Sequence, residues 1–360
     1  MSVLRFQGPV LPDGEVRDVY VVDGVVSHEP HPGVSVTASG WIVPGLVDAH
    51  CHIGLNDLGA APEEETLEQA VANRDAGALL IRDCGSAADT RWVQAREDLP
   101  RLIRCGRHIG RTHRYIRNYA HEVEPADLAD YARAEAGRGD GWVKLVGDWI
   151  SREEGDLTPC FPADAFAAGI TAAHEAGAKV TAHCFGTGVL KGLIEAGIDC
   201  IEHGTGLTPD LIDLMVQQGT ALVPTIMQLD KFPEHVAAGK DRFPTYAATV
   251  ADLYQRMPAT IMAAYKAGVP IFAGSDGGGI SRHGNIVGEV EALVRIGMPV
   301  IEALGAASWR GREWLGFNGH LAPGTEADLV VYPADPLKDL SVLRSPSVVV
   351  LRGKIVSGRV

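Results

Sequence analysis

Residues 41–55 read WIVPGLVDAHCHIGL, and the interpretation of the rest of the chain begins from this stretch. Two apolar runs flank a Pro-Gly turn, and the second run leads into His50, Cys51 and His52. In a β-strand, residues two positions apart point to the same face. The two histidines would therefore converge on one point, and paired imidazoles are natural ligands of zinc or a similar divalent ion. The alternative for this triplet alone is two ordinary surface histidines at a strand end.

Short apolar runs alternate with helical stretches from residue 42 onward. The eight runs are IVPGLVDAH, ALLIRDCG, RLIRCG, WVKLVGD, KVTAHC, DCIEHG, TALVPTI and PIFAGSD. Strands that are apolar throughout and alternate with helices form parallel sheets buried on both faces. Eight such units predict an α/β fold, a (β/α)₈ TIM barrel over residues 43–319.

The two ends of the chain have a different character. Short strand-like runs separated by Asp-Gly and Pro-Gly turns fill residues 1–42, and β character returns after residue 320 in PGTEADLVVYPADP and SVVVLRGKIVSG. We expect these two segments, 1–42 and 320–360, to pair in one small composite β-sandwich. The barrel would then be inserted in the middle of this second domain.

Composition excludes several classes of function. The formal net charge of -14 argues against a general nucleic-acid binder, which needs a basic face, and against a binder of anionic membranes. No apolar run reaches the ~20 residues of a membrane span, and the first residues lack the apolar run of a signal peptide. The six cysteines contain no Cys-x-x-Cys pair. We therefore expect a cytoplasmic protein with reduced thiols that acts on a small molecule, with a homo-oligomer left open.

Side chains that bind metals stand at the ends of four predicted barrel strands, where such barrels place their active sites. His50 and His52 end the first run, His183 and His203 end two later runs, and Asp276 ends the last. A single histidine at a strand end is often only hydrogen-bonded, and an aspartate before glycine is often a turn or cap residue. Four histidines and an aspartate together favour a metal centre.

Lys144 lies inside the apolar run WVKLV, which is predicted to be a buried strand. Keeping an unpaired ammonium charged there would cost roughly 4–7 kcal/mol. The lysine must therefore pair with an acid, lose its proton or be modified. A neutral amine reacts with carbon dioxide to give a carbamate, an anion that bridges two metals, and this is the interpretation we favour. The alternative is a salt bridge across the barrel, for example to Asp83.

The ordered set His50-Cys51-His52, Lys144, His183, His203 and Asp276 resembles the amidohydrolase superfamily. The phrases PGLVDAHCH, IEHG, GSD and PGTEADLVV strengthen this resemblance, which covers essentially the whole chain. Within the superfamily, the sequence is most similar to the branch that contains imidazolonepropionase-type enzymes and prolidase-like metal-dependent dipeptidases.

The resemblance implies two metal ions, usually zinc. It places His50, His52 and Asp276 on the first ion, His183 and His203 on the second, and carboxylated Lys144 and a hydroxide between the two. Asp276 would also be the catalytic general base and acid. Two departures stand out. Cys51 replaces the Thr or other small residue that is common there, and LVGDWISREEGD follows Lys144 without the Ser-Gly-Gly phrase of the dipeptidases.

A basic segment follows the third run. Its members are Arg101, Arg104, Arg107, Arg111, Arg114 and Arg117, with His108 and His113. Because arginine binds carboxylates in bidentate fashion, one hypothesis is a carboxylate-bearing substrate, and the other is a salt-bridged surface segment. The predicted substrate contacts are Arg111, Arg114, Tyr115, His121, Trp149 and His283.

These observations predict a metal-dependent hydrolase that cleaves an amide or related C–N bond, with an N-acyl amino acid or dipeptide as the hypothetical substrate. A metal-bridging hydroxide would attack the carbonyl. The alternative is a mononuclear deaminase or cyclic-amide hydrolase acting on a heterocycle. A scaffold that has lost catalysis would lack some of the ligands, and none is missing. Metal stoichiometry and the modification of Lys144 distinguish the two enzymes.

Overall fold

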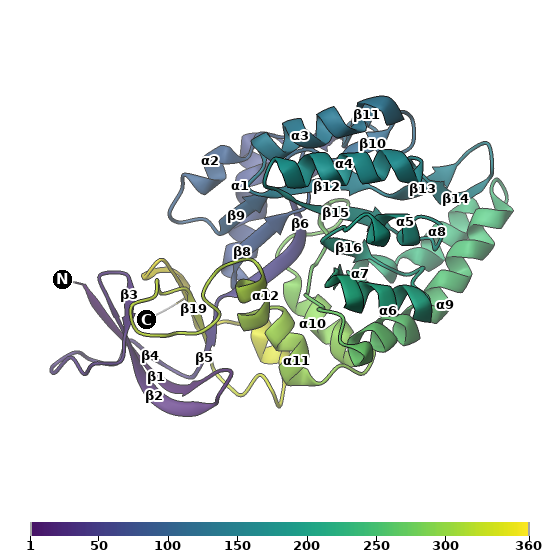
Figure 1. Cartoon of the computed structure of the whole chain (residues 1–360). Helices are drawn as coiled ribbons and strands as arrows, with labels where there is room; N and C mark the ends of the chain where they lie inside the picture. The colour runs from purple at the N-terminus through teal and green to yellow at the C-terminus, as the bar shows by residue number, and fades with distance from the viewer. Residues whose placement is uncertain (1, 359–360) are drawn as a thin grey trace.

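The computed structural model describes residues 2–358 and separates into a β-rich end and a larger α/β part (Figure 1). Strands from the two ends of the chain, purple and yellow in Figure 1, lie together at the β-rich end. Helices α1 to α9 gather around the strands of the α/β part. None of the helices in residues 2–358 is long and apolar enough to cross a membrane.

The β-rich end is one eight-stranded sheet. Its order is β21-β20-β19-β5-β1-β2-β3, with β4 paired to β1. The antiparallel pair of β5 and β19 joins the two ends of the chain, as predicted, although the strands belong to a single sheet. Buried apolar residues such as Phe6, Val21 and Val350 form its core. The bounds are β1 Val3–Val10, β2 Glu15–Val22, β3 Val25–Ser27, β4 Ala38–Ser39, β5 Trp41–Pro44, β19 Leu329–Tyr332, β20 Val348–Leu351 and β21 Lys354–Gly358.

The α/β part is built on two sheets of mainly parallel strands, in the orders β18-β6-β8-β9 and β11-β10-β12-β15-β16-β17. The short β7 pairs antiparallel with β6, and β13 and β14 form a separate hairpin. The bounds are β6 Leu46–Asn56, β7 Gly59–Ala60, β8 Ala78–Asp83, β9 Arg101–Arg104, β10 Ile109–Arg111, β11 His121–Val123, β12 Trp142–Val146, β13 Asp148–Ser151, β14 Asp156–Pro159, β15 Lys179–Cys184, β16 Cys200–His203, β17 Ala221–Val223 and β18 Gly277–Gly279.

Each of the first seven predicted runs contains a regular strand of the α/β part, whereas residues 270–276 do not form one. This last segment is held instead by single bonds, a bridge from Ile271 to Leu222 and a hydrogen bond from the amide of Ala49 to the carbonyl of Ala273 at 2.9 Å. Gly274 allows the close approach, because a Cβ there would lie 2.5 Å from the Cβ of His50.

Helices follow most of the parallel strands (Figure 1). The sequence marks some of their ends clearly: α6 starts with Pro209 after Thr208 and stops at Gly219, whose φ of 72° is left-handed. The bounds are α1 Glu63–Asp75, α2 Arg91–Gln94, α3 Leu128–Arg138, α4 Ala163–Glu175, α5 Leu190–Glu195, α6 Pro209–Gln218, α7 Ile226–Leu229, α8 Phe232–Gly239, α9 Pro244–Ala267, α10 Ile286–Arg295, α11 Val300–Ala306 and α12 Trp309–Trp314.

An apolar layer fills the interior near the amino-terminal ends of the strands. Val47, Trp142 and Ala221 stand at or next to the first residue of β6, β12 and β17, and all three belong to this layer. Trp314, at the end of α12, stacks on Phe272 with ring centroids 4.2 Å apart and planes 10° apart. The polar side chains predicted to bind metal are therefore left at the opposite, carboxyl ends.

Candidate metal centre

One cavity of about 320 Å³ gathers all the predicted metal ligands. They are His50, His52, Lys144, His183, His203 and Asp276. Four strands and the irregular segment 270–276 deliver these side chains: β6 carries the first two histidines, β12 the lysine, and β15 and β16 one histidine each. His183, His203 and Asp276 stand at or next to the carboxyl ends of their segments. The other three side chains reach the same cavity from within β6 and β12.

Three of these side chains form a compact triangle. The Nε2 atoms of His50 and His52 are 3.2 Å apart, and the Oδ1 atom of Asp276 lies 3.2 Å from the first and 3.1 Å from the second. Ligands that sit ~2.0–2.1 Å from a tetrahedral zinc ion are roughly 3.3 Å from one another. The spacing of the triangle therefore fits one ion.

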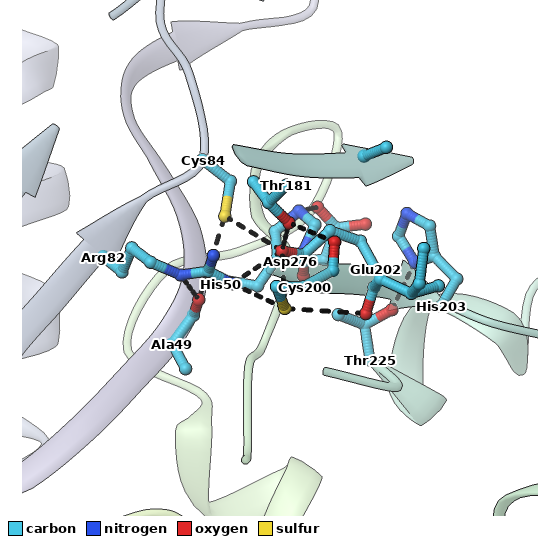
Figure 2. Close-up of polar contacts among 12 residues, drawn as sticks. Ala49, His50, Arg82, Cys84, Thr181, Cys200, Glu202, His203, Thr225 and Asp276 are labelled. Atoms are coloured by element: carbon cyan, nitrogen blue, oxygen red, sulfur yellow. Dashed lines mark hydrogen bonds and ion pairs between the residues drawn. The ribbon is translucent and has the colours of Figure 1, made fainter. Parts of the chain in front are cut away.

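The second nitrogen of three histidine rings has a partner of its own. Nδ1 of His50 lies 2.6 Å from Oε2 of Glu202, Nδ1 of His52 lies 2.8 Å from the carbonyl of Gly85, and Nδ1 of His203 lies 2.6 Å from the hydroxyl of Thr225. Figure 2 shows the first and the last of these contacts. Metal-binding histidines usually have such an outer partner, which fixes the tautomer and the ring orientation.

His183 and His203 lie side by side, with ring centroids 4.7 Å apart. The Nε2 atom of His183 is buried without a hydrogen-bond partner among the described residues, and the Oδ1 atom of Asp148 is 3.9 Å away. Burial and the neighbouring His203 and Lys144 hold the pKa of His183 well below its usual range, and burial lowers the pKa of His203 to about 3. Both rings are therefore neutral at pH 7, the form that binds metal.

Lys144 is 1% exposed in the middle of β12. Among the described residues, no hydrogen bond or ion pair to its ammonium is formed. Asp83, the partner expected in the salt-bridge alternative, accepts a hydrogen bond from the amide of Gly85 at 2.9 Å instead. Burial raises the pKa of Asp83 to about 8. Within residues 2–358, no carboxylate thus forms an ion pair with this buried lysine.

The backbone is strained at two of the candidate ligands. His203 has a φ of 68° and Asp276 a φ of 52°, in the left-handed region that residues other than glycine rarely adopt. Such conformations cost of the order of 1–3 kcal/mol each and collect at functional sites. The amide of Asp276 donates to the carbonyl of His50 at 2.8 Å, which ties the last ligand to the first.

Two of the six predicted substrate contacts line the cavity. The rings of Tyr115 and Trp149 meet edge to face with centroids 4.8 Å apart. Trp149 also lies 5.2 Å from the ring of His183, and Tyr115 lies 5.9 Å from it. These two aromatic side chains can therefore contact a molecule bound at the centre.

The two predicted arginines do not line this cavity. Arg111 forms an ion pair with Glu124 at 2.8 Å. Arg114 donates to the carbonyl of Trp149 at 2.9 Å and to the hydroxyl of Thr158 at 2.7 Å, which ties its own segment to the β13–β14 hairpin. Both guanidinium groups are therefore used in holding the surrounding loops.

The two predicted histidines lie outside the cavity as well. His121 pairs with Glu135 at 3.0 Å and lines a separate cavity of about 530 Å³. His283 contacts Asn73 at 3.0 Å and the Sγ atom of Cys51 at 3.4 Å. Cys51 points away from the ligand triangle, because it alternates along β6 with the two histidines that flank it.

Sequence reasoning missed a buried ion pair beside the centre. Glu202 is fully buried, and its Oε1 atom accepts from Nη2 of Arg82 at 2.6 Å while its Oε2 atom contacts His50 (Figure 2). Burial would raise the pKa of Glu202, but Arg82 and His50 hold it well below its usual range. The signal was present: both charges interrupt apolar runs, ALLIRDCG and DCIEHG, as Lys144 interrupts WVKLV.

His108 is a second residue that was not singled out. Its ring stacks on that of His52 with centroids 5.0 Å apart, and it lines the cavity. Both of its ring nitrogens are buried without a hydrogen-bond partner in the described part of the chain. His108 belongs to the basic segment, and sequence spacing alone does not show which side chains of that segment turn inwards. It could therefore not be identified as a cavity residue from the sequence.

The sequence profile of the Amidohydrolase family matches residues 41–356. The chain belongs to this family. It is therefore an enzyme, a hydrolase of C–N bonds from a metal-dependent family. Among its relatives, this amidohydrolase is similar to the uncharacterized protein Rv2915c of Mycobacterium tuberculosis, with 52% identity over 357 residues that cover 98% of this chain and 95% of the relative.

Solved structures of other enzymes share the fold. A Xaa-Pro dipeptidase with bound methionine superposes with a TM-score of 0.83 at 24% identity, over 99% of this chain and all of the other (100%). The ochratoxinase of A. niger superposes with a TM-score of 0.80 at 19% identity, over 99% of this chain and 96% of the other. At these identities, the likeness concerns the architecture of the amidohydrolase and its prolidase-like neighbours.

Proposed function

We propose that this amidohydrolase cleaves an amide or a related C–N bond at a dinuclear zinc centre. His50, His52 and Asp276 would hold one ion, His183 and His203 the other, and Lys144, carboxylated by carbon dioxide, would bridge them. The triangle of His50, His52 and Asp276, whose ligand atoms are 3.1–3.2 Å apart, carries the proposal that this centre binds metal. The unpartnered nitrogen of His183 supports the second position.

Zinc, when bound, supplies Lewis-acid chemistry and brings the pKa of water towards ~7. Asp276 is the residue of the chain that would move the proton. Burial alone would raise its pKa, but His50 and His52 hold the pKa of this carboxyl well below its usual range, so it is ionised and able to accept. It would take the proton of the attacking water and pass it to the leaving nitrogen as general base and then general acid.

Among the described residues, Lys144 has no hydrogen bond or ion pair, and this supports its proposed bridging role. A neutral lysine amine adds to the carbon of carbon dioxide and releases one proton, which leaves a carbamate anion. This anion would remove the cost of an unpaired buried ammonium, and it would supply oxygen ligands beside the neutral rings of His183 and His203. Glu202 would act behind the centre, because it fixes the ring of His50 through Nδ1.

The alternative is a mononuclear deaminase or cyclic-amide hydrolase that acts on a heterocycle. One observation favours it: in the described part of the chain, the triangle of His50, His52 and Asp276 is already a complete three-ligand group, whereas the other histidines meet it less closely. The enzyme would then use one ion and leave Lys144 without a bridging role.

For the architecture, we propose that the parallel strands close into a (β/α)₈ barrel over residues 43–319, with 1–42 and 320–360 as a composite β-sandwich. The continuous segment that carries β9 and β10 supports this closure on one side, and the bonds of residues 270–276 to β6 and β17 support it on the other. The cytoplasmic location and the homo-oligomer stay predictions.

Metal analysis together with ¹³C NMR of protein equilibrated with ¹³C-labelled bicarbonate tests the proposal. We expect two zinc ions per chain and a carbamate resonance that disappears in Lys144→Met. A screen of N-acyl amino acids, dipeptides and cyclic amides would then reveal C–N hydrolysis. One ion per chain with no carbamate resonance, together with ammonia release from a heterocycle, would establish the deaminase instead.

A further inference from the structure

A second cavity, of about 530 Å³, lies between the segments that follow β8 and β9 and the carboxyl end of α3. No described residue lines both this cavity and that of the metal centre. Gly85 lies at the boundary between them: its neighbour Ser86 lines the second cavity, whereas its own carbonyl accepts from Nδ1 of His52. Ligand sites typically measure roughly 300–1,000 Å³, so the second cavity has the size of a small-molecule site of its own.

Arginine is the predominant charged residue of the second cavity. Among the described residues, four arginines and three carboxyl side chains line it. Three of these arginines have a carboxylate partner: Arg91 pairs with Asp89, Arg104 with Asp140 at 2.8 Å, and Arg138 with Glu135 at 3.2 Å. The charges of these three are therefore balanced by the chain itself, and the fourth arginine, Arg107, is the exception.

Arg107 is half-buried and forms no ion pair with any of the described residues. Its Nε atom donates to the carbonyl of Tyr119 at 3.0 Å and its Nη2 atom to the carbonyl of Asn118 at 3.1 Å, which fixes the guanidinium in place. Two of its five N–H donors are thus used, and Nη1 has no hydrogen bond in the described part of the chain. In a chain of net charge -14, a fixed and unpaired guanidinium in a cavity favours an anionic occupant.

Asp83 adds a buried donor to the same cavity. It is 1% exposed and belongs to the lining. Its Oδ1 atom accepts from the amide of Gly85 at 2.9 Å, and within residues 2–358 its Oδ2 atom has no hydrogen bond. Burial raises the pKa of Asp83 to about 8, so this carboxyl holds a proton at pH 7. With Oδ1 accepting, the proton is left on Oδ2, which can donate to a ligand. Asp83 and Arg107 therefore both favour an occupant rich in acceptor oxygens.

We propose that the second cavity binds a small metabolite through an oxyanion group, a phosphate or a carboxylate, which Arg107 holds by its free N–H donors. Guanidinium groups bind both kinds of anion. The assignment does not rest on the proposed hydrolysis, because the metal centre lies in a different cavity. One competing position exists: Arg107 also lines a neighbouring cavity of about 520 Å³, together with Arg111 and Arg117. Gly137 distinguishes the two, because it lines the second cavity but not the neighbouring one.

Calorimetry with inorganic phosphate and with succinate tests the assignment. Each probe is titrated into the zinc-loaded enzyme and into the same chain stripped of metal, because an anion can also bind zinc directly. We expect binding in both states, and the probe that binds more tightly identifies the group as a phosphate or a carboxylate. Arg107→Met should weaken this binding roughly 10- to 100-fold, as expected for a hydrogen bond between charged groups. Arg117→Met, which removes an exposed charge from the neighbouring cavity, should leave it unchanged.

Gly137 offers a pair of variants that leave Arg107 and its loop in place. It lies in α3, and a Cβ added to it would meet no atom within 4 Å, so a larger residue fits there. Gly137→Glu brings a negative charge to the cavity and Gly137→Gln a neutral side chain of the same size, so we expect the former to bind the probe about 10-fold more weakly than the latter. The assignment is overturned if neither probe binds, if binding is lost with the metal, if Arg107→Met binds as the wild type does, or if the two Gly137 variants have equal affinity.

Discussion

Two buried cations inside the α/β part, Arg82 and Lys144, have opposite surroundings. Arg82 is fully buried, with Glu202 at 2.6 Å, the carbonyl of Ala49 at 2.7 Å, and the rings of Trp142 and Trp314 at 4.5 and 4.8 Å from its guanidinium carbon. Lys144 is equally buried, yet the described residues give it neither an acid nor a hydrogen bond.

The difference indicates a structural role for Arg82 and a chemical role for Lys144. Burying an ion is costly unless it is paired and hydrogen-bonded, and Arg82 is paired through Nη2 and hydrogen-bonded through Nε, although its Nη1 atom has no partner among the described residues. Among the described residues Lys144 meets neither condition, and the proposed carboxylation and metal binding would supply the missing partner. Removing Arg82 should therefore reduce the stability of the fold, whereas removing Lys144 should reduce activity and metal binding.

Lys144→Met gives the largest expected effect. We expect activity to fall well beyond the ~10- to 100-fold that is typical of an outer-shell partner, because the bridging ligand itself is lost. The melting temperature of the metal-free protein should not fall, since the described residues form no hydrogen bond or ion pair with this ammonium. Steady-state kinetics and metal analysis measure the first effect, and calorimetry measures the second. Lys144→Glu, which restores a carboxylate, should retain more metal; equal metal loss in both variants would contradict a bridging anion.

Arg82→Met should show the reverse pattern. Removing the guanidinium leaves the buried charge of Glu202 without its arginine partner, and breaking a buried pair in this way costs about 3–5 kcal/mol of unfolding free energy. Urea denaturation of the metal-free protein measures this cost. The matched control is Arg295→Met, whose ion pair with Asp230 is largely exposed, so that a change of about 0–1 kcal/mol is expected. Similar losses in the two variants would show that burial does not distinguish these ion pairs.

The candidate ligands could be brought together from the sequence because the histidines and Asp276 end apolar runs and Lys144 interrupts one. Strand period and parallel pairing then place these side chains in one cavity, and their binding of metal stays a prediction. The charged residues within those runs were equally visible. The rule that singled out Lys144 applies unchanged to Arg82 and Glu202, and applying it would have predicted the buried pair.

The loops could not be predicted in the same way. No periodicity directs the side chains of residues 105–119, so Arg114 turned out to brace the β13–β14 hairpin while His108 turned inwards to His52. Residues 270–276 looked like a strand from their apolar composition. Their glycine allows an approach to His50 that leaves them outside the regular ladder.

Glu202→Gln tests the connection between the structural pair and the metal centre. The amide can still accept from Nδ1 of His50 but no longer carries the charge that strengthens this contact. We expect the affinity for zinc to fall ~10- to 100-fold, as is usual for the outer partner of a metal-binding histidine. Competition with a chromogenic chelator measures it. Unchanged affinity would mean that Glu202 serves Arg82 alone.

Two buried carboxylates differ in the same way: Glu202 is paired with Arg82, whereas Asp83 forms no ion pair with any of the described residues. Burial raises the pKa of Asp83 from 3.8 to about 8, so between these values the folded protein holds a proton that the unfolded chain releases. Stability from this group is therefore lost as pH rises, by about 2 kcal/mol between pH 6 and pH 8.

Asp83→Asn should remove that loss, because the amide oxygen can still accept from Gly85 and carries no titrating proton. The measurement is urea unfolding of metal-free wild type and variant at pH 6, 7 and 8, with the stability of the variant falling less steeply. Asp89→Asn is the control: this exposed carboxyl pairs with Arg91, which holds its pKa at about 2, so the slope should not change. Parallel slopes in wild type and Asp83→Asn would mean that Asp83 is ionised in the folded protein, and a cation would then have to lie close to it after all.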